Sequence, residues 1–273
     1  MTYRNFDEES LEREYTPASR IENIQVYLDS YKERGMLARR EFSHEKLIYG
    51  EHPDEWLWYA PKAETKSRRL VVFVHGGFWR RLSADDGTFL TPKFHEFGQN
   101  FASINYSLCP TESLETLVDQ TSRAIDYLVT RHDAKNMTLI GHSAGAHLIA
   151  MAMCRFSAPE FASALFVSGI FDLEPISQMS VNDAVQLDLA SAHRFSPIHF
   201  VSQAKNTPVG IIWGENETGE FKRQSLDFAS SWSSIAGHST ANSLEISLRN
   251  HFDVLDDLTE PTIIQLINSK LNE

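Results

Sequence analysis

The chain alternates between short, continuously apolar runs and segments whose apolar residues recur at helical spacing. The apolar runs predict strands at 57–59, 69–74, 102–106, 137–140, 164–167, 209–213 and 244–248. The helical spacing predicts helices at 114–130, 144–154, 222–231 and 262–268, and a helix end at 94–100. Strands that are apolar throughout and separated by helices favour an α/β fold, with a mostly parallel central sheet and helices on both faces.

The first 45 residues have a different pattern, being polar and helical. The residues Ile21, Ile24, Val26, Leu28 and Tyr31 mark one face of this region. We interpret residues 1–45 as an N-terminal helical arm or cap segment packed on the core. Because the sequence has no internal repeat and no long Pro/Gly/Ser linker, residues 1–273 are expected to form a single domain.

Composition and charge restrict the class of protein. Of the 273 residues, 42% are hydrophobic and 23% are charged, which is typical of a globular chain. The net charge of −12 disfavours a nucleic-acid partner, because phosphate binding requires clustered Lys and Arg. No apolar run approaches the ~18 residues of a membrane span, and the charged N-terminus lacks the apolar segment of a signal peptide. We therefore expect a cytoplasmic protein that binds neither nucleic acid nor a membrane.

Only two cysteines occur, Cys109 and Cys154. They form neither a C-x-x-C pair nor a zinc-binding spacing, so we expect no disulfide framework, no metal and no cofactor. The sequence does not specify the oligomeric state, and a homodimer stays open.

A G-x-S-x-G motif, Gly141-His142-Ser143-Ala144-Gly145, lies between a predicted strand and a predicted helix. This setting is that of the nucleophile elbow of α/β-hydrolases, in which small residues flanking the Ser allow a tight turn. Ser143 is therefore the candidate nucleophile. The alternative is a structural Gly/Ser turn.

A serine nucleophile needs a base and an acid, which follow in the order Ser, acid, His in this fold. His251 follows the last predicted strand, whereas the other late histidines precede it, so His251 is the candidate base. The loop after the strand at 209–213 carries Glu215, Glu217 and Glu220. A carboxylate facing the imidazole would fix its tautomer, but spacing alone does not choose among the three.

The segment His75-Gly76-Gly77-Phe78-Trp79 follows an earlier predicted strand. In this class of hydrolase an HGGG-like loop at that place supplies oxyanion-hole N–H groups, so Gly77, Phe78 and Ala144 are the expected donors. Three further aromatic residues beyond predicted strands are candidates for substrate contact: Trp79, Tyr106 and Phe171.

The chain resembles the kynurenine formamidase (arylformamidase) family of α/β-hydrolases in segments spread over nearly its whole length. These segments are LEREYTP (11–17), HGGFW (75–79), YSLCP (106–110), LVDQ (117–120), GHSAGAHL (141–148), VSGIFDLEP (167–175), VQL (185–187), GENETGEFKRQS (214–225) and HF (251–252). The resemblance implies a triad of Ser143, an acid and His251. The family's acid is Asp, and its position falls on Glu217 here, while Glu215 and Asp172 remain alternatives.

The resemblance also implies the activity, which is hydrolysis of the formamide of N-formyl-L-kynurenine through a formyl-serine intermediate. The expected partner is a small aromatic substrate. Two alternatives stay open: a carboxylesterase of broader small-acyl specificity on the same fold, and a binding protein that has lost catalysis.

Overall fold

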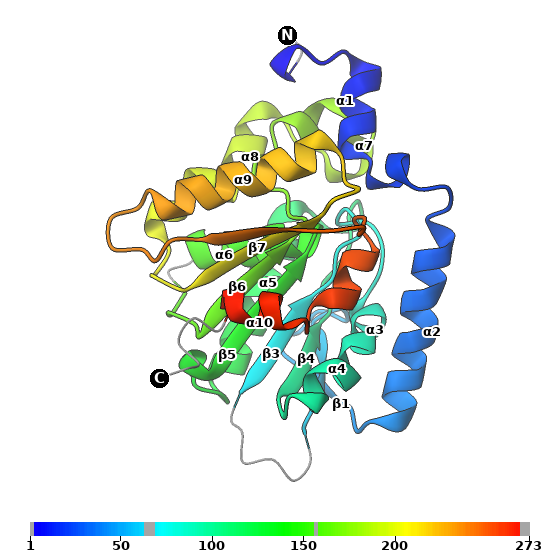
Figure 1. Ribbon diagram of the computed structural model, residues 1–273, viewed down its shortest axis with the longest axis vertical. Helices are drawn as coiled ribbons and strands as arrows, with labels where there is room; N and C mark the ends of the chain where they lie inside the picture. Colours follow the sequence, from blue (N-terminus) through cyan, green and yellow to red (C-terminus); the bar gives the residue numbers. More distant parts are fainter. Residues whose placement is uncertain (1–2, 63–68, 156–157, 268–273) are drawn as a thin grey trace.

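The computed structural model describes residues 3–62, 69–155 and 158–267 and contains an eight-stranded sheet (Figure 1). The strands are β1 (Glu45–Ile48), β2 (Trp56–Ala60), β3 (Leu70–Val74), β4 (Asn100–Ile104), β5 (Met137–His142), β6 (Ser163–Val167), β7 (Val209–Gly214) and β8 (Asn242–Ile246). Their order is β1-β2-β4-β3-β5-β6-β7-β8. The pairs β1–β2 and β2–β4 are antiparallel, and the remaining neighbours are parallel.

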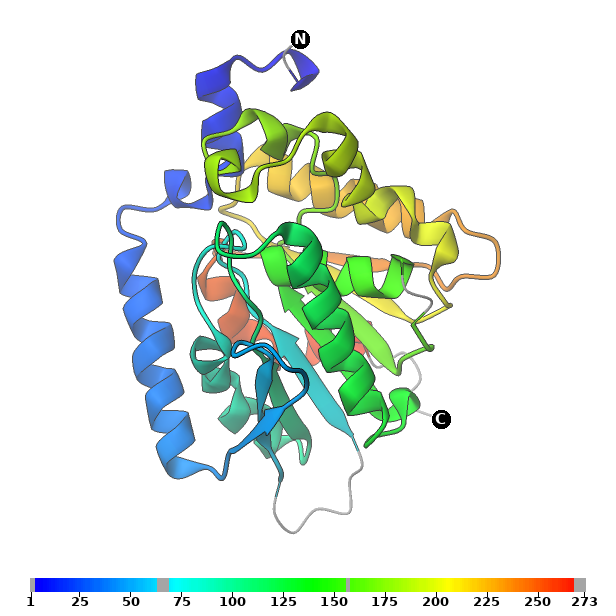
Figure 2. The ribbon, with the colours of Figure 1, turned by 180° about the vertical axis from the view of Figure 1, so that it is seen from behind.

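Helices cover both faces of this sheet, as the fold prediction requires. The α-helices are α1 (Glu8–Tyr15), α2 (Gln25–Glu41), α3 (Ala84–Gly87), α4 (Thr91–Glu96), α5 (Leu114–Val129), α6 (Ala144–Arg155), α7 (Asn182–Val185), α8 (Leu189–Arg194), α9 (Gly219–Ser233) and α10 (Pro261–Ile267). The views from opposite sides show α4 and α10 in front of the sheet in Figure 1 and α5 and α6 in front of it in Figure 2.

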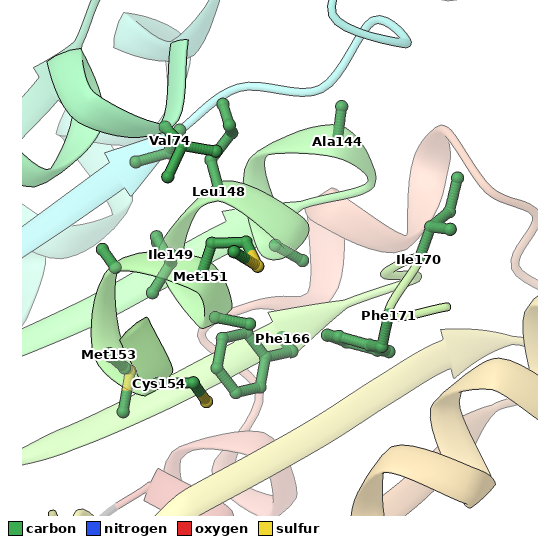
Figure 3. Close-up of a cluster of buried hydrophobic side chains, with 14 of the residues drawn as sticks. Val74, Ala144, Leu148, Ile149, Met151, Met153, Cys154, Phe166, Ile170 and Phe171 are labelled. Atoms are coloured by element: carbon green, nitrogen blue, oxygen red, sulfur yellow. The ribbon is translucent and has the colours of Figure 1, made fainter. Parts of the chain in front are cut away.

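Successive side chains of the buried strands point to opposite faces of the sheet, and each face packs against its own layer of helices. In β3, Val72 and Val74 belong to the apolar cluster that contains side chains of α5, α6 and α9. Val71 and Phe73 point to the other face and belong to a second cluster with side chains of α2, α4 and α10. Figure 3 shows part of the first cluster, where side chains of α6 lie beside Phe166 of β6. Both faces are covered, which accounts for the absence of polar residues in β3.

Most predicted elements are confirmed, and the differences lie mainly at strand ends. Strand β4 begins at Asn100 and ends at Ile104 because its register pairs these residues with Leu70 and Val74. Strand β8 ends at Ile246, before Leu248, which has a left-handed backbone (φ +63°) and an 82% exposed side chain. Strand β1 was not predicted. The last predicted helix corresponds to α10, and its residue 268 lies outside the described residues.

The N-terminal region is helical as expected, in two pieces. Helix α1 lies beside α7, and α2 runs along the side of the molecule near α3 (Figures 1 and 2). In α2, Tyr31 is buried, donates a hydrogen bond to the carbonyl oxygen of Phe252 and stacks on Phe89. Val26 is 62% exposed, so it does not share the packed face to which Ile24 and Leu28 belong. In the described residues, no helix is both long and apolar enough to cross a membrane.

Candidate active site

The turn at Ser143 has the backbone of a nucleophile elbow. Ser143 follows β5 directly, precedes α6 and has a left-handed backbone (φ +54°). A Cβ on Gly141 would lie 2.5 Å from the Cα of Ala146, and one on Gly145 would lie 2.1 Å from the carbonyl oxygen of Val74. Both positions therefore require glycine, because any side chain would push the strand and the helix apart.

His251 and Glu217 meet as an acid–base pair next to this turn. The distance between His251 Nδ1 and Glu217 Oε2 is 2.8 Å, and both side chains are buried. The oxygen of a carboxylate accepts, so His251 Nδ1 carries the proton and Nε2 keeps its lone pair in the neutral ring. His251 and Ser143 line the same cavity, so the candidate base and the candidate nucleophile belong to one site.

Glu217 is fixed in place by two further hydrogen bonds. Its Oε1 accepts from Ser168 Oγ at 2.6 Å and from the backbone N–H of Gly214 at 2.7 Å. Ser168 has a left-handed backbone (φ +51°) directly after β6. The sequence analysis did not single out Ser168, although it lies in the quoted segment VSGIFDLEP.

The competing carboxylates lie elsewhere. Glu215 is exposed and accepts from the backbone N–H of Leu248, on the outer side of the loop. Asp172 accepts from the hydroxyl of Tyr3 at 3.2 Å. Glu220 binds Tyr15 and Arg223. Of these carboxylates, the one in contact with His251 is Glu217, which removes the ambiguity left by sequence spacing.

The glycine-rich loop after β3 has the geometry needed to present amide groups. Gly77, Phe78 and Trp79 have successive positive φ angles of +103°, +52° and +58°. In the described part of the chain, the backbone N–H groups of Gly77, Phe78 and Ala144 make no hydrogen bond. A Cβ on Gly76 would lie 3.0 Å from the Cβ of Ser143, so this loop passes very close to the elbow. The loop that carries Gly77 and Phe78 therefore lies beside the elbow that carries Ala144.

Two buried histidines support the elbow and the loop as neutral side chains. His142 Nε2 donates to the carbonyl oxygen of His251 at 2.8 Å, and burial lowers the pKa of His142 to about 3. His75 Nδ1 donates to the carbonyl oxygen of Gly76, and burial lowers the pKa of His75 to about 4. Both rings are therefore uncharged near neutral pH, so neither adds a positive charge beside His251.

The three aromatic residues predicted to contact the substrate do not line the cavity that contains Ser143 and His251. Trp79 is fully buried and donates from its indole nitrogen to His147. Tyr106 stacks on His75 at 4.2 Å and donates to the carbonyl oxygen of His75 at 2.8 Å, so it supports the oxyanion loop from behind. Phe171 is also fully buried and stacks on Phe228 at 4.1 Å. A position just beyond a strand does not separate core aromatics from pocket aromatics.

A cavity of about 290 Å³ lies over the candidate triad. Its floor includes Ser143, His251 and Phe78, and its walls come from the N-terminal arm and from residues 179–181. The arm contributes Glu12, Thr16, Pro17, Ala18, Ile24, Leu28 and Tyr31. The sequence analysis identified the arm as a cap but none of these residues as pocket residues. Glu12, Thr16 and Pro17 belong to the segment LEREYTP, which was quoted for its resemblance, and Ile24, Leu28 and Tyr31 belong to the face predicted from helical spacing.

No metal centre is evident beside this cavity. Within residues 3–62, 69–155 and 158–267, no group of three or more His, Cys, Asp or Glu side chains is arranged to hold a metal ion. At the elbow, the side chains that can take part in acyl transfer are the hydroxyl of Ser143, the imidazole of His251 and the carboxylate of Glu217 behind it. Together with free amide N–H groups, these can carry out acyl transfer to a serine.

The chain is similar to several known proteins in sequence and in fold. The BD-FAE family model matches residues 58–168. A kynurenine formamidase from Danio rerio is 28% identical over 276 residues, which cover 94% of each chain. A crystal structure provisionally described as a thioesterase from a Silicibacter species has a TM-score of 0.84 and 24% identity, covering 94% of this chain and 98% of that one. Esterase B from Lactobacillus rhamnosis has a TM-score of 0.70 and 16% identity, covering 91% and 93%.

The fold, the elbow and these similarities point to the same superfamily. The parallel sheet carries its candidate site at the carboxyl ends of β3, β5 and β7, as open α/β sheets do. The chain therefore has the α/β-hydrolase fold, and it is similar to kynurenine formamidases over nearly its whole length.

Proposed function

We propose that this protein hydrolyses the formamide bond of N-formyl-L-kynurenine, releasing kynurenine and formate. The observation that carries the proposal is the hydrogen bond from His251 Nδ1 to Glu217, because it leaves Nε2 as a base in the cavity that Ser143 also lines. The similarity to kynurenine formamidases along 94% of the chain supports the choice of substrate.

In the first half of the proposed reaction, Ser143 Oγ attacks the formyl carbon while His251 Nε2 takes the hydroxyl proton. The N–H groups of Gly77, Phe78 and Ala144 stabilise the oxyanion, and loss of one such donor typically costs about 3–4 kcal/mol of transition-state stabilisation. His251 then gives its proton to the arylamine nitrogen, and the C–N bond breaks. Formyl-Ser143 remains.

In the second half, His251 takes a proton from water, whose oxygen attacks the formyl carbon of the ester. The proton returns to Ser143 Oγ as the ester bond breaks, and formate leaves. Glu217 stabilises the imidazolium in both halves without taking the proton. A formyl group needs little space, which suits the close approach of Gly76 to Ser143.

The direct test is incubation of the purified protein with N-formyl-L-kynurenine and measurement of formate and kynurenine. Stoichiometric release of both is expected, and Ser143→Ala serves as the control for spontaneous hydrolysis. If the wild-type protein releases formate no faster than Ser143→Ala, the proposed reaction is wrong.

The second candidate function is that of a carboxylesterase with small acyl groups, favoured by the fold shared with esterases. Esters and formanilides use the same nucleophile and oxyanion donors, so geometry at Ser143 does not separate them. The two functions are separated by comparing kcat/KM for N-formyl-L-kynurenine with kcat/KM for aryl acetates. A higher value for the acetates would favour the esterase.

The remaining expectations stay predictions. We propose a small aromatic molecule as the partner, without nucleic acid or membrane, in the cytoplasm. Whether the protein forms a homodimer is left to a measurement of mass in solution.

A further inference from the structure

Charges of both signs line the candidate cavity without partners of opposite charge. Arg80 and Arg81 are on one wall and Glu12 is on another. In the described residues, neither guanidinium group takes part in an ion pair, and the Glu12 carboxylate does not either. Arg81 is exposed, and Arg80 and Glu12 are half-buried, so solvent reaches these charges and a ligand in the cavity can replace that solvent. Two positive groups and one negative group on the walls of one cavity point to a ligand that carries both charges.

The two arginines are held next to the oxyanion loop. The backbone N–H groups of Arg80 and Arg81 both donate to the carbonyl oxygen of Gly77, at 3.0 and 3.1 Å. A Cβ on Gly77 would lie 2.2 Å from the carbonyl oxygen of Arg81, so this turn is tight. The two guanidinium groups are therefore attached to a fixed turn, which directly follows the amides of Gly77 and Phe78 in the chain. Guanidinium is the side-chain group best suited to binding a carboxylate.

Glu12 is fixed by neutral donors, which leaves its charge uncompensated. Its two carboxylate oxygens accept from Ser180, one from the hydroxyl at 2.6 Å and the other from the backbone N–H at 2.9 Å. Each oxygen keeps acceptor capacity for another donor. Glu12 comes from α1 and Ser180 from the segment before α7, so this wall exists only where the N-terminal arm is docked.

We propose that Arg80 and Arg81 bind the α-carboxylate of the substrate and that Glu12 binds its α-ammonium, so that the cavity selects a zwitterionic amino-acid group attached to the reacting aryl formamide. This inference rests on the proposed function for the position of the reacting bond, but the recognition of an amino acid is separable from the reaction. It also explains how a protein of net charge −12 accepts a ligand that bears a carboxylate.

The binding test compares L-kynurenine with 2-aminoacetophenone, which has the same aryl ketone without the amino acid. Isothermal calorimetry measures both affinities, and neither compound carries a formyl group to be hydrolysed. We expect the wild-type protein to bind L-kynurenine about 10- to 100-fold more tightly, as charge-assisted hydrogen bonds provide. The ratio should fall to within about threefold in Arg80→Gln/Arg81→Gln and to an intermediate value in Glu12→Gln.

The matched control is Arg13→Gln, which removes a positive charge from α1 next to Glu12 at a side chain outside this cavity. It should leave the affinity ratio of the wild-type protein intact. Melting temperatures show whether each variant is folded. Equal wild-type affinities for the two compounds, or an unchanged ratio in the double arginine variant, would overturn the proposal. An unchanged ratio in Glu12→Gln would overturn the assignment of the ammonium group.

A kinetic experiment separates this inference from the proposed function. It compares kcat/KM for N-formyl-L-kynurenine and for 2-formamidoacetophenone, and the ratio should fall about 10- to 100-fold in the double arginine variant. If both formamides are inert while L-kynurenine still binds selectively, the reaction is wrong and the amino-acid site stands. If both formamides react equally well, the reaction stands and the amino-acid site is wrong.

Discussion

Replacing Glu217 by Gln changes one atom of the carboxyl group and reverses the proton arrangement at His251. In Glu217→Gln, the amide oxygen of the new side chain must face the backbone N–H of Gly214, because that group can only donate. The amide nitrogen then faces His251 Nδ1, where the carboxylate oxygen lay 2.8 Å away. An N–H donor there requires a lone pair on Nδ1, which places the imidazole proton on Nε2.

The size of the effect follows from this tautomer. With its proton on Nε2, His251 cannot take the proton of Ser143, and the imidazolium loses its counter-charge. A wrong tautomer of this kind costs about 10,000-fold in kcat, or about 5 kcal/mol. Glu217→Asp keeps the charge and the tautomer but shortens the side chain by one methylene, and a misplacement of about 1 Å costs about 100-fold.

The assay is kcat/KM for N-formyl-L-kynurenine, with an aryl acetate as a second substrate that uses the same triad. Glu215→Gln is the matched control, since it makes the same chemical change two residues away in an exposed carboxylate. We expect the control to stay within about twofold of the wild-type protein. A Glu217→Gln variant that keeps more than about a tenth of the activity would refute the tautomer argument.

Three further predictions concern the nucleophile, metal independence and acid stability. Ser143→Ala should lower kcat by at least about 1,000-fold with an unchanged circular dichroism spectrum, because the hydroxyl is the attacking group. EDTA should leave kcat/KM unchanged, and a loss of activity restored by a divalent metal would contradict the proposed mechanism. Burial lowers the pKa of His75, His142 and His147 to about 4, about 3 and about 4. Below about pH 6.5 the unfolded chain binds protons at these three sites and the folded chain does not, so the folded state becomes less stable as the pH falls. The free energy of unfolding measured in urea should therefore decrease by about 2 kcal/mol per histidine between about pH 7.5 and about pH 5. A total loss below about 2 kcal/mol would show that these rings are not buried as neutral groups.

Sequence reasoning predicted those parts of the site that depend on local backbone geometry. Ser143 needs glycine at 141 and 145, because a Cβ at either position would collide with backbone atoms. Gly77 lies at φ +103°, a conformation that most side chains disfavour. Such constraints act within a few residues, so they leave a readable pattern in the sequence.

Features that depend on contacts between distant segments could not be predicted in the same way. Glu215 and Glu217 are two residues apart, and the choice between them depends on Ser168 and His251, which are 49 and 34 residues from Glu217 in the chain. Trp79 and Tyr106 follow strands, as pocket residues do. In the interior, however, Trp79 donates a hydrogen bond to His147, and Tyr106 donates one to the carbonyl oxygen of His75. Hydrophobic character alone does not distinguish the two outcomes.

The N-terminal arm is helical because of its local sequence pattern, but its position depends on contacts with distant segments of the chain. Tyr15 at the end of α1 is fully buried, and its hydroxyl donates to Glu220 at 2.7 Å and accepts from Gln224 at 3.0 Å, both in α9. Gln224 in turn accepts from the backbone N–H of Phe171 and donates to the carbonyl oxygen of Asp172.

This network joins the arm to the helix that begins just after Glu217, so the wall carrying Glu12 and the loop carrying the candidate acid share one anchor. Buried hydrogen-bonded networks are costly to leave partly satisfied, because each unpaired group keeps its desolvation penalty. Undocking the arm would therefore break the hydrogen bonds of Tyr15 to Glu220 and Gln224 as well as open the cavity. The pocket wall is for this reason an integral part of the fold rather than an appendage to it.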